Sequence, residues 1–178
     1  MPGRPDPFAR NIVLVGFMGT GKSVVGKLLA ERLGRPFLDL DRKIERVAGR
    51  AVAQIFEGEG EAGFRKRERE MVREAAALEG HVVAAGGGVM MDDENIRLLK
   101  GSGWLVCLTA SPDVILRRTS AALQNRPLLG GGEPRERVEA LLKLRAPFYA
   151  KADVAVDTSD RPVKEIVEEV LRWIAAKR

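Results

Sequence analysis

Residues 16–23 read Gly-Phe-Met-Gly-Thr-Gly-Lys-Ser and match the phosphate-binding pattern G-x-x-x-x-G-K-[ST]. An apolar run precedes them and a segment of helical periodicity follows them. In that setting the glycines let successive backbone N–H groups face phosphate oxygens, and the helix N-terminus adds partial positive charge. Lys22 can then reach the β- and γ-phosphates, and the Ser23 hydroxyl can bind Mg²⁺. The pattern predicts a nucleoside triphosphate site; the alternative is a glycine-rich turn with an incidental lysine.

Two aspartates, Asp39 and Asp41, close the segment Phe-Leu-Asp-Leu-Asp at residues 37–41. Residues two apart in an extended segment point to the same side, so we expect both carboxylates to face the phosphate site. One could support the metal through water while the other accepts a hydrogen bond from a substrate hydroxyl. The alternative is that either aspartate caps the helix that follows.

A glycine-marked turn at Gly60 leads into a segment with four basic residues among positions 65–69. We expect most of these side chains to form a solvated face, and Arg65, beside Phe64 at the helix start, to point inward. Residues 86–88 are three consecutive glycines after a strand-like run. Their bare backbone would allow a ligand to approach closely, although a tight turn also uses glycine.

Short apolar runs and helix-period segments have to position these groups. The strand-like runs are 12–16, 36–40, 81–86, 104–108 and 152–157, and the helical segments are 22–33, 61–79, 111–120, 135–145 and 162–176. Their alternation predicts an α/β fold with a parallel sheet covered on both sides. Residues 40–63 and 119–134 interrupt the alternation. Such insertions usually lie at the carboxyl ends of strands, where ligands bind; the alternative is ordinary surface loops.

The length of 178 residues suits one globular domain, with residues 1–10 as a flexible leader. The sequence has one cysteine, Cys107, and one histidine, His81, which excludes a Cys/His zinc site and indicates a reducing compartment. We expect both residues to be structural. No apolar run has the length of a bilayer span and no secretory signal is visible, so we expect a cytoplasmic protein.

The net charge of +5, carried mainly by arginine, favours an anionic partner. Aromatic residues make up only 5% of the chain and no dense basic tail is present, so nucleic acid is not the expected partner. The chain is too short for a helicase pair, and the guanine-reading motif N-K-x-D does not occur in it. These observations favour a small-molecule kinase among the proteins that use a phosphate-binding loop.

Six motifs follow one another along the chain: GFMGTGKS, DLD, GExxFR, GGG, RPLL at 126–129 and RAPFY at 145–149. Together they resemble the shikimate kinase family, from about Asn11 onward. The resemblance implies a three-layer P-loop kinase fold with a five-stranded parallel sheet, a substrate-binding insertion at about 40–68 and a mobile lid at about 119–134. It also implies transfer of the γ-phosphate of ATP to the 3-hydroxyl of shikimate, on the route to chorismate and the aromatic amino acids.

The same resemblance implies roles for individual residues. The ATP-binding residues would be Gly19, Thr20, Gly21, Lys22, Ser23, Val24, Arg118, Arg126 and Arg161, with Arg118 and Arg161 beside the adenine. The substrate-binding residues would be Asp41, Arg65, Gly86, Gly87, Gly88 and Arg145, with the two arginines on the carboxylate and Asp41 on the ring hydroxyls. Ser23 and Asp39 would bind Mg²⁺, Asp39 in its outer shell. Lys22, Asp41 and Arg126 would be catalytic, and Arg126 would move onto the phosphates with the lid.

The expected partners are ATP and shikimate, with Mg²⁺ as cofactor and neither nucleic acid nor a membrane, and the expected state is a monomer. One departure from the family is Glu59, which stands where aspartate is common. A gluconate or nucleoside monophosphate kinase stays open as an alternative, and so does a basic nucleic-acid-binding protein. Asp41 could act as a general base or only orient the hydroxyl.

Overall fold

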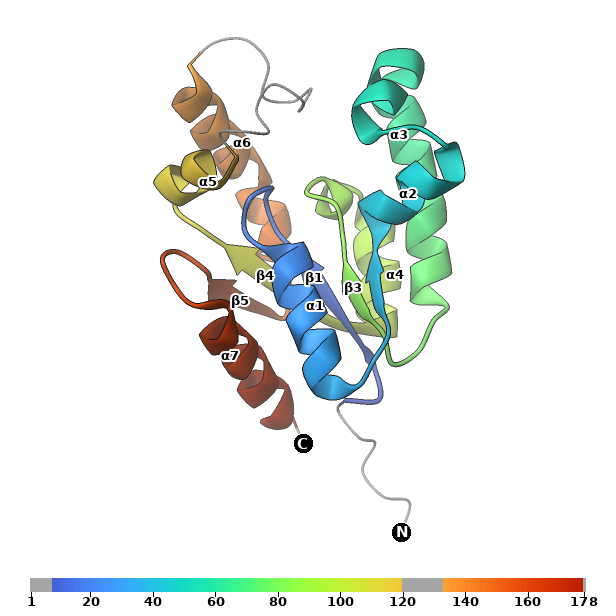
Figure 1. Ribbon diagram of the computed structural model, residues 1–178. Coiled ribbons are helices and arrows are strands. Elements are labelled where there is room, and N and C mark those ends of the chain that lie inside the picture. Colours follow the sequence, from blue (N-terminus) through green and yellow to red (C-terminus); the bar gives the residue numbers. More distant parts are fainter. Residues whose placement is uncertain (1–7, 120–132, 178) are drawn as a thin grey trace.

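The computed structural model describes residues 8–119 and 133–177. Strands and helices alternate along the chain (Figure 1). The strands are β1 (Asn11–Val15), β2 (Phe37–Asp39), β3 (Val82–Ala84), β4 (Gly103–Thr109) and β5 (Val154–Asp157). The helices are α1 (Lys22–Leu33), α2 (Leu40–Ala48), α3 (Val52–Ala76), α4 (Asp93–Ser102), α5 (Pro112–Thr119), α6 (Pro134–Tyr149) and α7 (Val163–Ala175), together with the short 3-10 helix η1 (Val89–Met91).

The five strands form one parallel sheet in the order β2-β3-β1-β4-β5, which confirms the predicted fold class. β1 lies in the centre, with Leu14 opposite Ala84 of β3 and Val106 of β4. The chain goes to one side of β1 for β2 and β3 and to the other side for β4 and β5. In open α/β sheets, ligands bind beyond the carboxyl ends of the strands at such a switch in order. The phosphate-binding loop follows β1 at that point.

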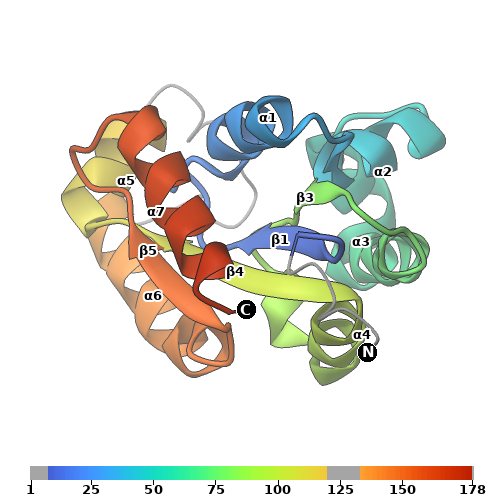
Figure 2. The same ribbon diagram turned by 90° about the horizontal axis from the view of Figure 1, so that it is seen from below.

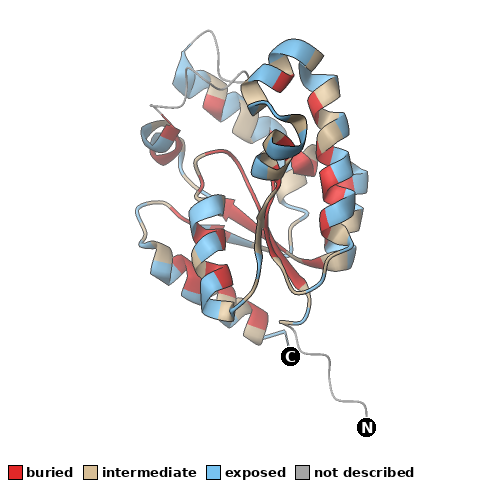
Figure 3. Cartoon of the chain, turned by 45° about the vertical axis from the view of Figure 1, so that its right-hand side comes forward, coloured by how far each residue is buried: buried red, intermediate tan, exposed pale blue. Residues whose placement is uncertain are grey.

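Helices cover both faces of the sheet, with α1 and α7 on one face and α3 and α4 on the other (Figure 2). Ile12 and Leu14 of β1 pack with α1 and α7, whereas Val13 and Val15 pack with α3 and α4. Successive residues of a strand face opposite sides, so a strand covered twice must be apolar throughout. Figure 3 shows this burial in the strands and on the inner sides of the helices.

The segment 40–63 is mostly helical, where the sequence showed only short helical patterns. α2 follows β2 without a loop, and α3 begins at Val52 rather than at residue 61. Gly60, with φ 70° and ψ −178°, makes a kink inside α3, so the predicted glycine turn is a break within one helical element. The glycines of this segment are poor helix formers, which is why the sequence did not indicate the full helix.

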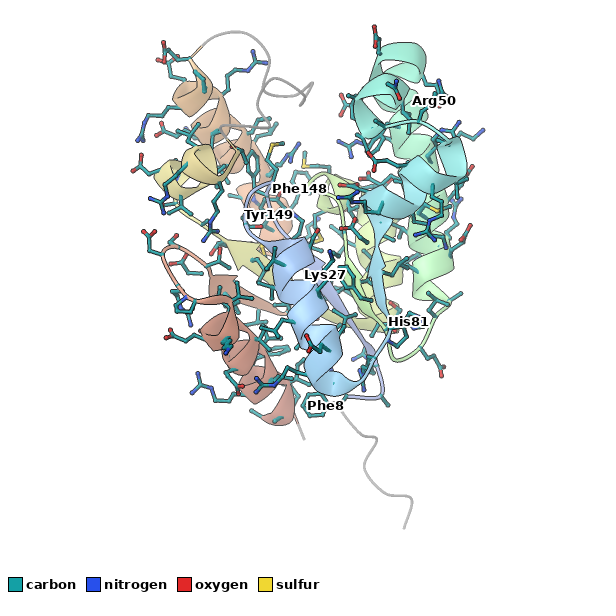
Figure 4. The ribbon with its side chains drawn as sticks, viewed as in Figure 1. Phe8, Lys27, Arg50, His81, Phe148 and Tyr149 are labelled. Carbon is teal, nitrogen blue, oxygen red and sulfur yellow. The ribbon has the colours of Figure 1, made fainter. Side chains whose placement is uncertain are left out.

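Ion pairs hold the two sides of this kink together. Glu59 accepts hydrogen bonds from Nε and Nη2 of Arg67, both at 2.9 Å, and it also pairs with Arg50 before the helix. Figure 4 shows Arg50 at the outer end of the insertion. Glu59 stands where aspartate is common in the family. Its carboxylate pairs with Arg50, which precedes it in the sequence, and with Arg67, which follows it.

Helix α4 was not predicted from the sequence. The side chain of Asp92 caps this helix by accepting hydrogen bonds from the N–H groups of Glu94 (2.9 Å) and Asn95 (3.4 Å). The predicted helix 135–145 corresponds to α6 but extends to Tyr149. Pro147 lies inside α6, at a type of position where proline usually ends a helix.

Residues 1–7 of the predicted leader and residues 120–132 of the predicted lid lie outside the described residues. Within the described ranges, no helix is both long and apolar enough to cross a membrane. Cys107 is buried in β4, and His81 comes just before β3. Figure 4 shows His81 at the opposite end of the sheet from Tyr149. Both placements agree with the structural roles expected for Cys107 and His81.

Candidate active site

The loop after β1 folds around the side chain of Lys22. The ammonium group donates hydrogen bonds to the carbonyl oxygens of Gly16 (2.9 Å) and Phe17 (2.8 Å). Gly16 has a φ of 133°, and a Cβ there would overlap the carbonyl oxygen of Leu108 on β4, so this position needs glycine. Gly21 is the N-cap of α1, in the left-handed conformation. The result is a tight loop at a helix N-terminus, an arrangement that suits phosphate.

Ser23 and Asp39 lie together beside this loop. The Ser23 hydroxyl donates to Oδ2 of Asp39 at 2.6 Å, and Oδ1 of Asp39 accepts the N–H of Arg42 at 3.2 Å. Asp39 ends β2 and is the N-cap of α2, so it both caps a helix and faces the predicted phosphate site. Hydroxyl and carboxylate oxygens are the ligands that Mg²⁺ prefers.

The expectation that Asp39 and Asp41 share an extended segment is wrong. β2 ends at Asp39 and α2 begins at Leu40, because the Asp39 cap starts the helix there. Asp41 lies in the first turn of α2, where the partial positive charge of the helix end favours a carboxylate. Both aspartates nevertheless line the same cavity.

Two adjoining cavities lie at the carboxyl ends of the strands, where α2 and α3 stand on one side and α5 and α6 on the other (Figure 1). The larger, of about 710 Å³, lies against the insertion and the glycine segment 86–88. The smaller, of about 210 Å³, lies over the phosphate-binding loop. The residues that line both are Met18, Ser23, Asp39, Asp41 and Gly87. A phosphate donor in the smaller cavity would therefore be in reach of a molecule in the larger one.

The glycine segment makes room for charged side chains of the site itself. A Cβ on Gly86 would lie 2.8 Å from Oδ1 of Asp41 and 3.1 Å from Oε1 of Glu68. A Cβ on Gly88 would overlap the guanidinium of Arg65. The bare backbone expected to admit a ligand thus also admits the residues that face that ligand.

Arg65 and Glu68 form the inner part of α3 at the larger cavity. Nη1 of Arg65 donates to Oε2 of Glu68 at 2.7 Å, and Nη2 lies 3.4 Å from Oε1 of Glu61. Arg65 lines the larger cavity, as the sequence predicted, and Phe64 before it on the helix is buried. The guanidinium therefore lies at the cavity wall with a carboxylate already beside it.

Glu68 was not singled out from the sequence, although it lies at the centre of the site. The residue is 2% exposed, and within the described ranges its Oε1 atom has no hydrogen-bond partner. Burial raises the pKa of Glu68; the charge of Arg65 opposes this shift and the nearby Asp41 adds to it. Its spacing of three residues from Arg65 on a helix is the signal that could have found it.

Arg145 is a buried cation at the edge of the larger cavity. It is 4% exposed, and its guanidinium lies 5.3 Å from the centre of the Phe17 ring. Nη1 donates to the carbonyl oxygen of Gly87 at 3.1 Å, and no carboxylate of the described residues forms an ion pair with it. A buried charge is costly unless it is paired, so the site favours an anionic ligand.

Arg118 and Arg161 occupy different environments. Arg118 donates to the carbonyl oxygens of Gly19 (3.2 Å) and Thr158 (2.7 Å), which places it against the phosphate-binding loop. Thr158 in turn donates to the carbonyl oxygen of Thr20 at 2.9 Å. Arg161 pairs with Glu169 of α7 at 2.7 Å. The structure thus brings Arg118, but not Arg161, into direct contact with the loop.

Val24 and Arg126 are the remaining residues that were predicted to bind ATP. Val24 lies on the first turn of α1 and is 59% exposed, beside the smaller cavity. Arg126 lies outside the described residues. Thr158, like Glu68, was not predicted from the sequence, since only the fold brings the end of β5 against the phosphate-binding loop.

The comparisons with known proteins agree on one family. The shikimate kinase family model matches residues 18–175. A shikimate kinase from Symbiobacterium thermophilum is 49% identical over 163 residues, which is 90% of this chain and 94% of the relative. One from Caldanaerobacter subterraneus subsp. tengcongensis is 47% identical over 92% of this chain and 95% of its own length.

Solved structures give the same result. The structure described as shikimate kinase from Acinetobacter baumannii in complex with shikimate superposes with a TM-score of 0.91 at 39% identity, covering 96% of this chain and 95% of that one. A gluconokinase from Sinorhizobium meliloti has a TM-score of 0.59 at 22% identity, over 95% of this chain and 93% of that one. The second likeness shows a shared fold alone.

Proposed function

The chain belongs to the shikimate kinase family and is an ATP-dependent kinase that phosphorylates shikimate, and we propose the following division of work among its residues. The reaction transfers the γ-phosphate of ATP to the 3-hydroxyl and releases shikimate 3-phosphate and ADP. The observation that carries the proposal is the junction of the two cavities at Ser23, Asp39 and Asp41. A phosphate donor and an acceptor bound in these two cavities would lie side by side, and positioning supplies much of the catalysis in phosphoryl transfer.

The triphosphate of ATP binds the phosphate-binding loop. Its oxygens meet the N–H groups of residues 19–24 and the ammonium of Lys22, which then exchanges its contacts with the loop carbonyls for the β- and γ-phosphates. Arg118 and Arg161 lie beside the adenine. Arg126, on the lid segment, reaches the phosphates and neutralises charge in the transition state.

The carboxylate of shikimate binds Arg145 and Arg65. The case for carboxylate binding is stronger for Arg145 than for Arg65, because Arg145 is a buried guanidinium without a carboxylate partner in the described part of the chain. Arginine binds carboxylates through paired, charge-assisted hydrogen bonds that also fix orientation. The glycine segment 86–88 lines the same cavity, and its backbone N–H groups would add neutral donors.

The hydroxyl groups of shikimate meet carboxylate oxygens. Asp41 accepts the hydrogen bond of the reacting hydroxyl. Glu68 lines the same cavity, and its Oε1 atom is buried without a hydrogen-bond partner in the described ranges. The transition state of phosphoryl transfer is loose, so orientation of the hydroxyl matters more than early removal of its proton. A site built around hydroxyl groups also rejects analogues that lack one, because buried acceptors would stay unpaired.

Ser23 and Asp39 fit a magnesium site. Their oxygen atoms lie 2.6 Å apart beside the phosphate-binding loop, and Mg²⁺ commonly takes one or two protein oxygens together with phosphate oxygens and water. No cluster of three or more acidic, histidine or cysteine side chains that could hold a metal occurs in the described ranges. Ser23, through its hydroxyl, and Asp39 would hold the ion, which would supply positive charge against the phosphates.

An ADP-release assay tests this function against its rivals. Shikimate, gluconate, CMP and AMP are offered separately with ATP and Mg²⁺. We expect ADP release with shikimate alone, and phosphate on the 3-hydroxyl by NMR of the product. Faster turnover of gluconate or of a nucleotide would overturn the proposal. Omission of Mg²⁺ should abolish turnover.

The monomeric state and the cytoplasmic location stay predictions. Light scattering during size-exclusion chromatography checks the first, with 19.5 kDa as the mass expected of a monomer. Cell fractionation checks the second.

A further inference from the structure

Two donors from one helix meet at a single carbonyl oxygen of the site. Oη of Tyr149 lies 2.7 Å and Nη1 of Arg145 lies 3.1 Å from the carbonyl oxygen of Gly87. Tyr149 is the last residue of α6 and Arg145 precedes it by one turn, so both side chains leave the same face of the helix. The sequence contains no other tyrosine.

The hydrogen bond fixes the peptide unit between Gly87 and Gly88. In a planar trans peptide the C=O and the next N–H point in opposite directions, so a donor on the Gly87 carbonyl also sets the direction of the Gly88 N–H. Glycine on both sides would otherwise let this unit rotate, because glycine accepts φ of either sign. The cavity is lined by both residues.

The neighbouring carbonyls are held by the backbone instead. Gly86 accepts the N–H of Val89 at 3.2 Å, and Gly88 accepts the N–H of Met91 at 3.0 Å. Among residues 8–119 and 133–177, the donors to the Gly87 carbonyl are therefore the two side chains of α6.

Arg145 cannot use one N–H for both the Gly87 carbonyl and a ligand carboxylate. When that N–H turns toward the ligand, the carbonyl loses a donor, and an unpaired carbonyl in a buried place is costly. Tyr149 keeps the carbonyl paired through the exchange. The tyrosine thus lowers the free-energy cost of releasing Arg145.

We propose that Tyr149 is a positioning residue for the acid substrate: its hydroxyl holds the Gly87–Gly88 peptide in the binding orientation and leaves Arg145 to the carboxylate. The proposal rests on the proposed function, since it takes Arg145 and the glycine segment as shikimate contacts. Tyr149 acts through these groups and does not touch the reacting atoms.

The hydroxyl of Tyr149 stays protonated at neutral pH. Burial raises its pKa to about 12, and the charge of Arg145 opposes this shift. The other titratable groups that act on it are Cys107 on β4 and Arg65 on α3. Burial likewise raises the pKa of Cys107 to about 11, with Lys22 opposing, so that thiol is neutral as well. The donor to Gly87 is therefore present throughout the physiological range.

The first test is Tyr149→Phe, which removes the hydroxyl and keeps the ring. We expect the KM for shikimate to rise about tenfold, as for loss of one hydrogen bond at a binding site, while the KM for ATP changes less than about twofold. The matched control is Ser102→Ala, since the Ser102 hydroxyl also donates to a carbonyl, that of Leu99 at 3.0 Å, and Ser102 lies just before the amino end of β4, away from the carboxyl ends of the strands. The control should change neither KM.

A second test replaces the tyrosine without removing its hydroxyl. Because Tyr149 is the sole tyrosine, biosynthetic incorporation of 3,5-difluorotyrosine alters this residue only. The fluorinated phenol is more acidic and ceases to donate once it ionises. Shikimate affinity should therefore fall with rising pH at a lower pH in the fluorinated protein than in the native one, whereas ATP affinity should follow the same pH profile in both.

The outcomes distinguish failure of the role of Tyr149 from failure of the proposed function. An unchanged shikimate KM in Tyr149→Phe, equal losses for both substrates, or identical pH profiles for native and fluorinated protein would overturn the role of Tyr149. Failure of the native protein to phosphorylate shikimate would overturn the proposed function instead. If Tyr149→Phe does not fold, the fluorinated protein still decides the matter.

Discussion

Arg65 donates a 2.7 Å hydrogen bond to Oε2 of Glu68 and leaves the Oε1 atom of that carboxylate without a partner among the described residues. The two residues lie one turn apart on α3 and both line the larger cavity. The ion pair holds the guanidinium in place, and the second oxygen is buried with its capacity to accept a hydrogen bond unused among the described residues.

Replacing Glu68 with glutamine should change how stability depends on pH. Burial raises the pKa of Glu68 above its ordinary value of 4.5, so the folded chain binds this proton more tightly than the unfolded chain does. The stability contributed by the group is complete below 4.5 and is lost as the pH rises through the raised folded pKa.

The melting temperature of the native chain, relative to Glu68→Gln, should therefore increase as the pH is lowered from neutral toward the ordinary pKa of 4.5. Circular dichroism melts of both proteins across this range measure the difference. A difference that does not vary with pH would mean that Glu68 is not a buried carboxylate with a raised pKa.

Arg145→Ala and Arg65→Ala should weaken the binding of shikimate about 10- to 100-fold and that of ATP less than about twofold, because each removes charged hydrogen bonds to the carboxylate only. Titration calorimetry with each ligand measures both effects. Arg97→Ala is the control, because Arg97 pairs with Glu94 on the exposed side of α4. Equal losses for the two ligands would refute the assignment.

Gly88→Ala should impair shikimate binding by displacing Arg65, whose guanidinium occupies the space of the new methyl group. We expect a rise of about tenfold or more in the KM for shikimate, comparable with loss of a charged hydrogen bond. Gly101→Ala is the control, because a Cβ on Gly101 in α4 meets nothing within 4 Å and alanine favours the helix. A Gly88→Ala enzyme with native kinetics would show that Arg65 can bind from elsewhere.

Arg126→Ala should lower kcat on the order of 10³-fold if the residue supplies charge to the transition state as arginine fingers do. The loss should appear in kcat with little change in the affinity for shikimate. Steady-state kinetics with both substrates checks this. A change below about threefold would rule the role out.

The strands and most helices were predictable because short apolar runs indicate strands and a helical periodicity of apolar residues indicates helices, and both patterns can be read from residues near one another in the chain. β1 and β4 are buried on both faces and read as continuous apolar runs. α4 was missed because its inward residues are few: Asn95, Ile96 and Leu99 are buried. The helical course of residues 40–63 was missed because its glycines weaken the helix signal, while packing against the core overrides that weakness.

The sequence by itself determined the phosphate-binding loop and the family. The loop consists of a glycine-dependent turn, a lysine and the start of a helix, and each of these depends only on residues that are neighbours in the chain. The family resemblance names the expected acceptor residues, but only the tertiary structure brings them together around one cavity. Asp41, Arg65 and Arg145 come from three helices, and Tyr149 meets Gly87 across 62 residues of sequence. Such contacts, and the burial that raises the pKa of Glu68, depend on how helices pack around the sheet. The spacing of residues along the chain does not carry that information, because the packing sums many weak interactions between distant segments.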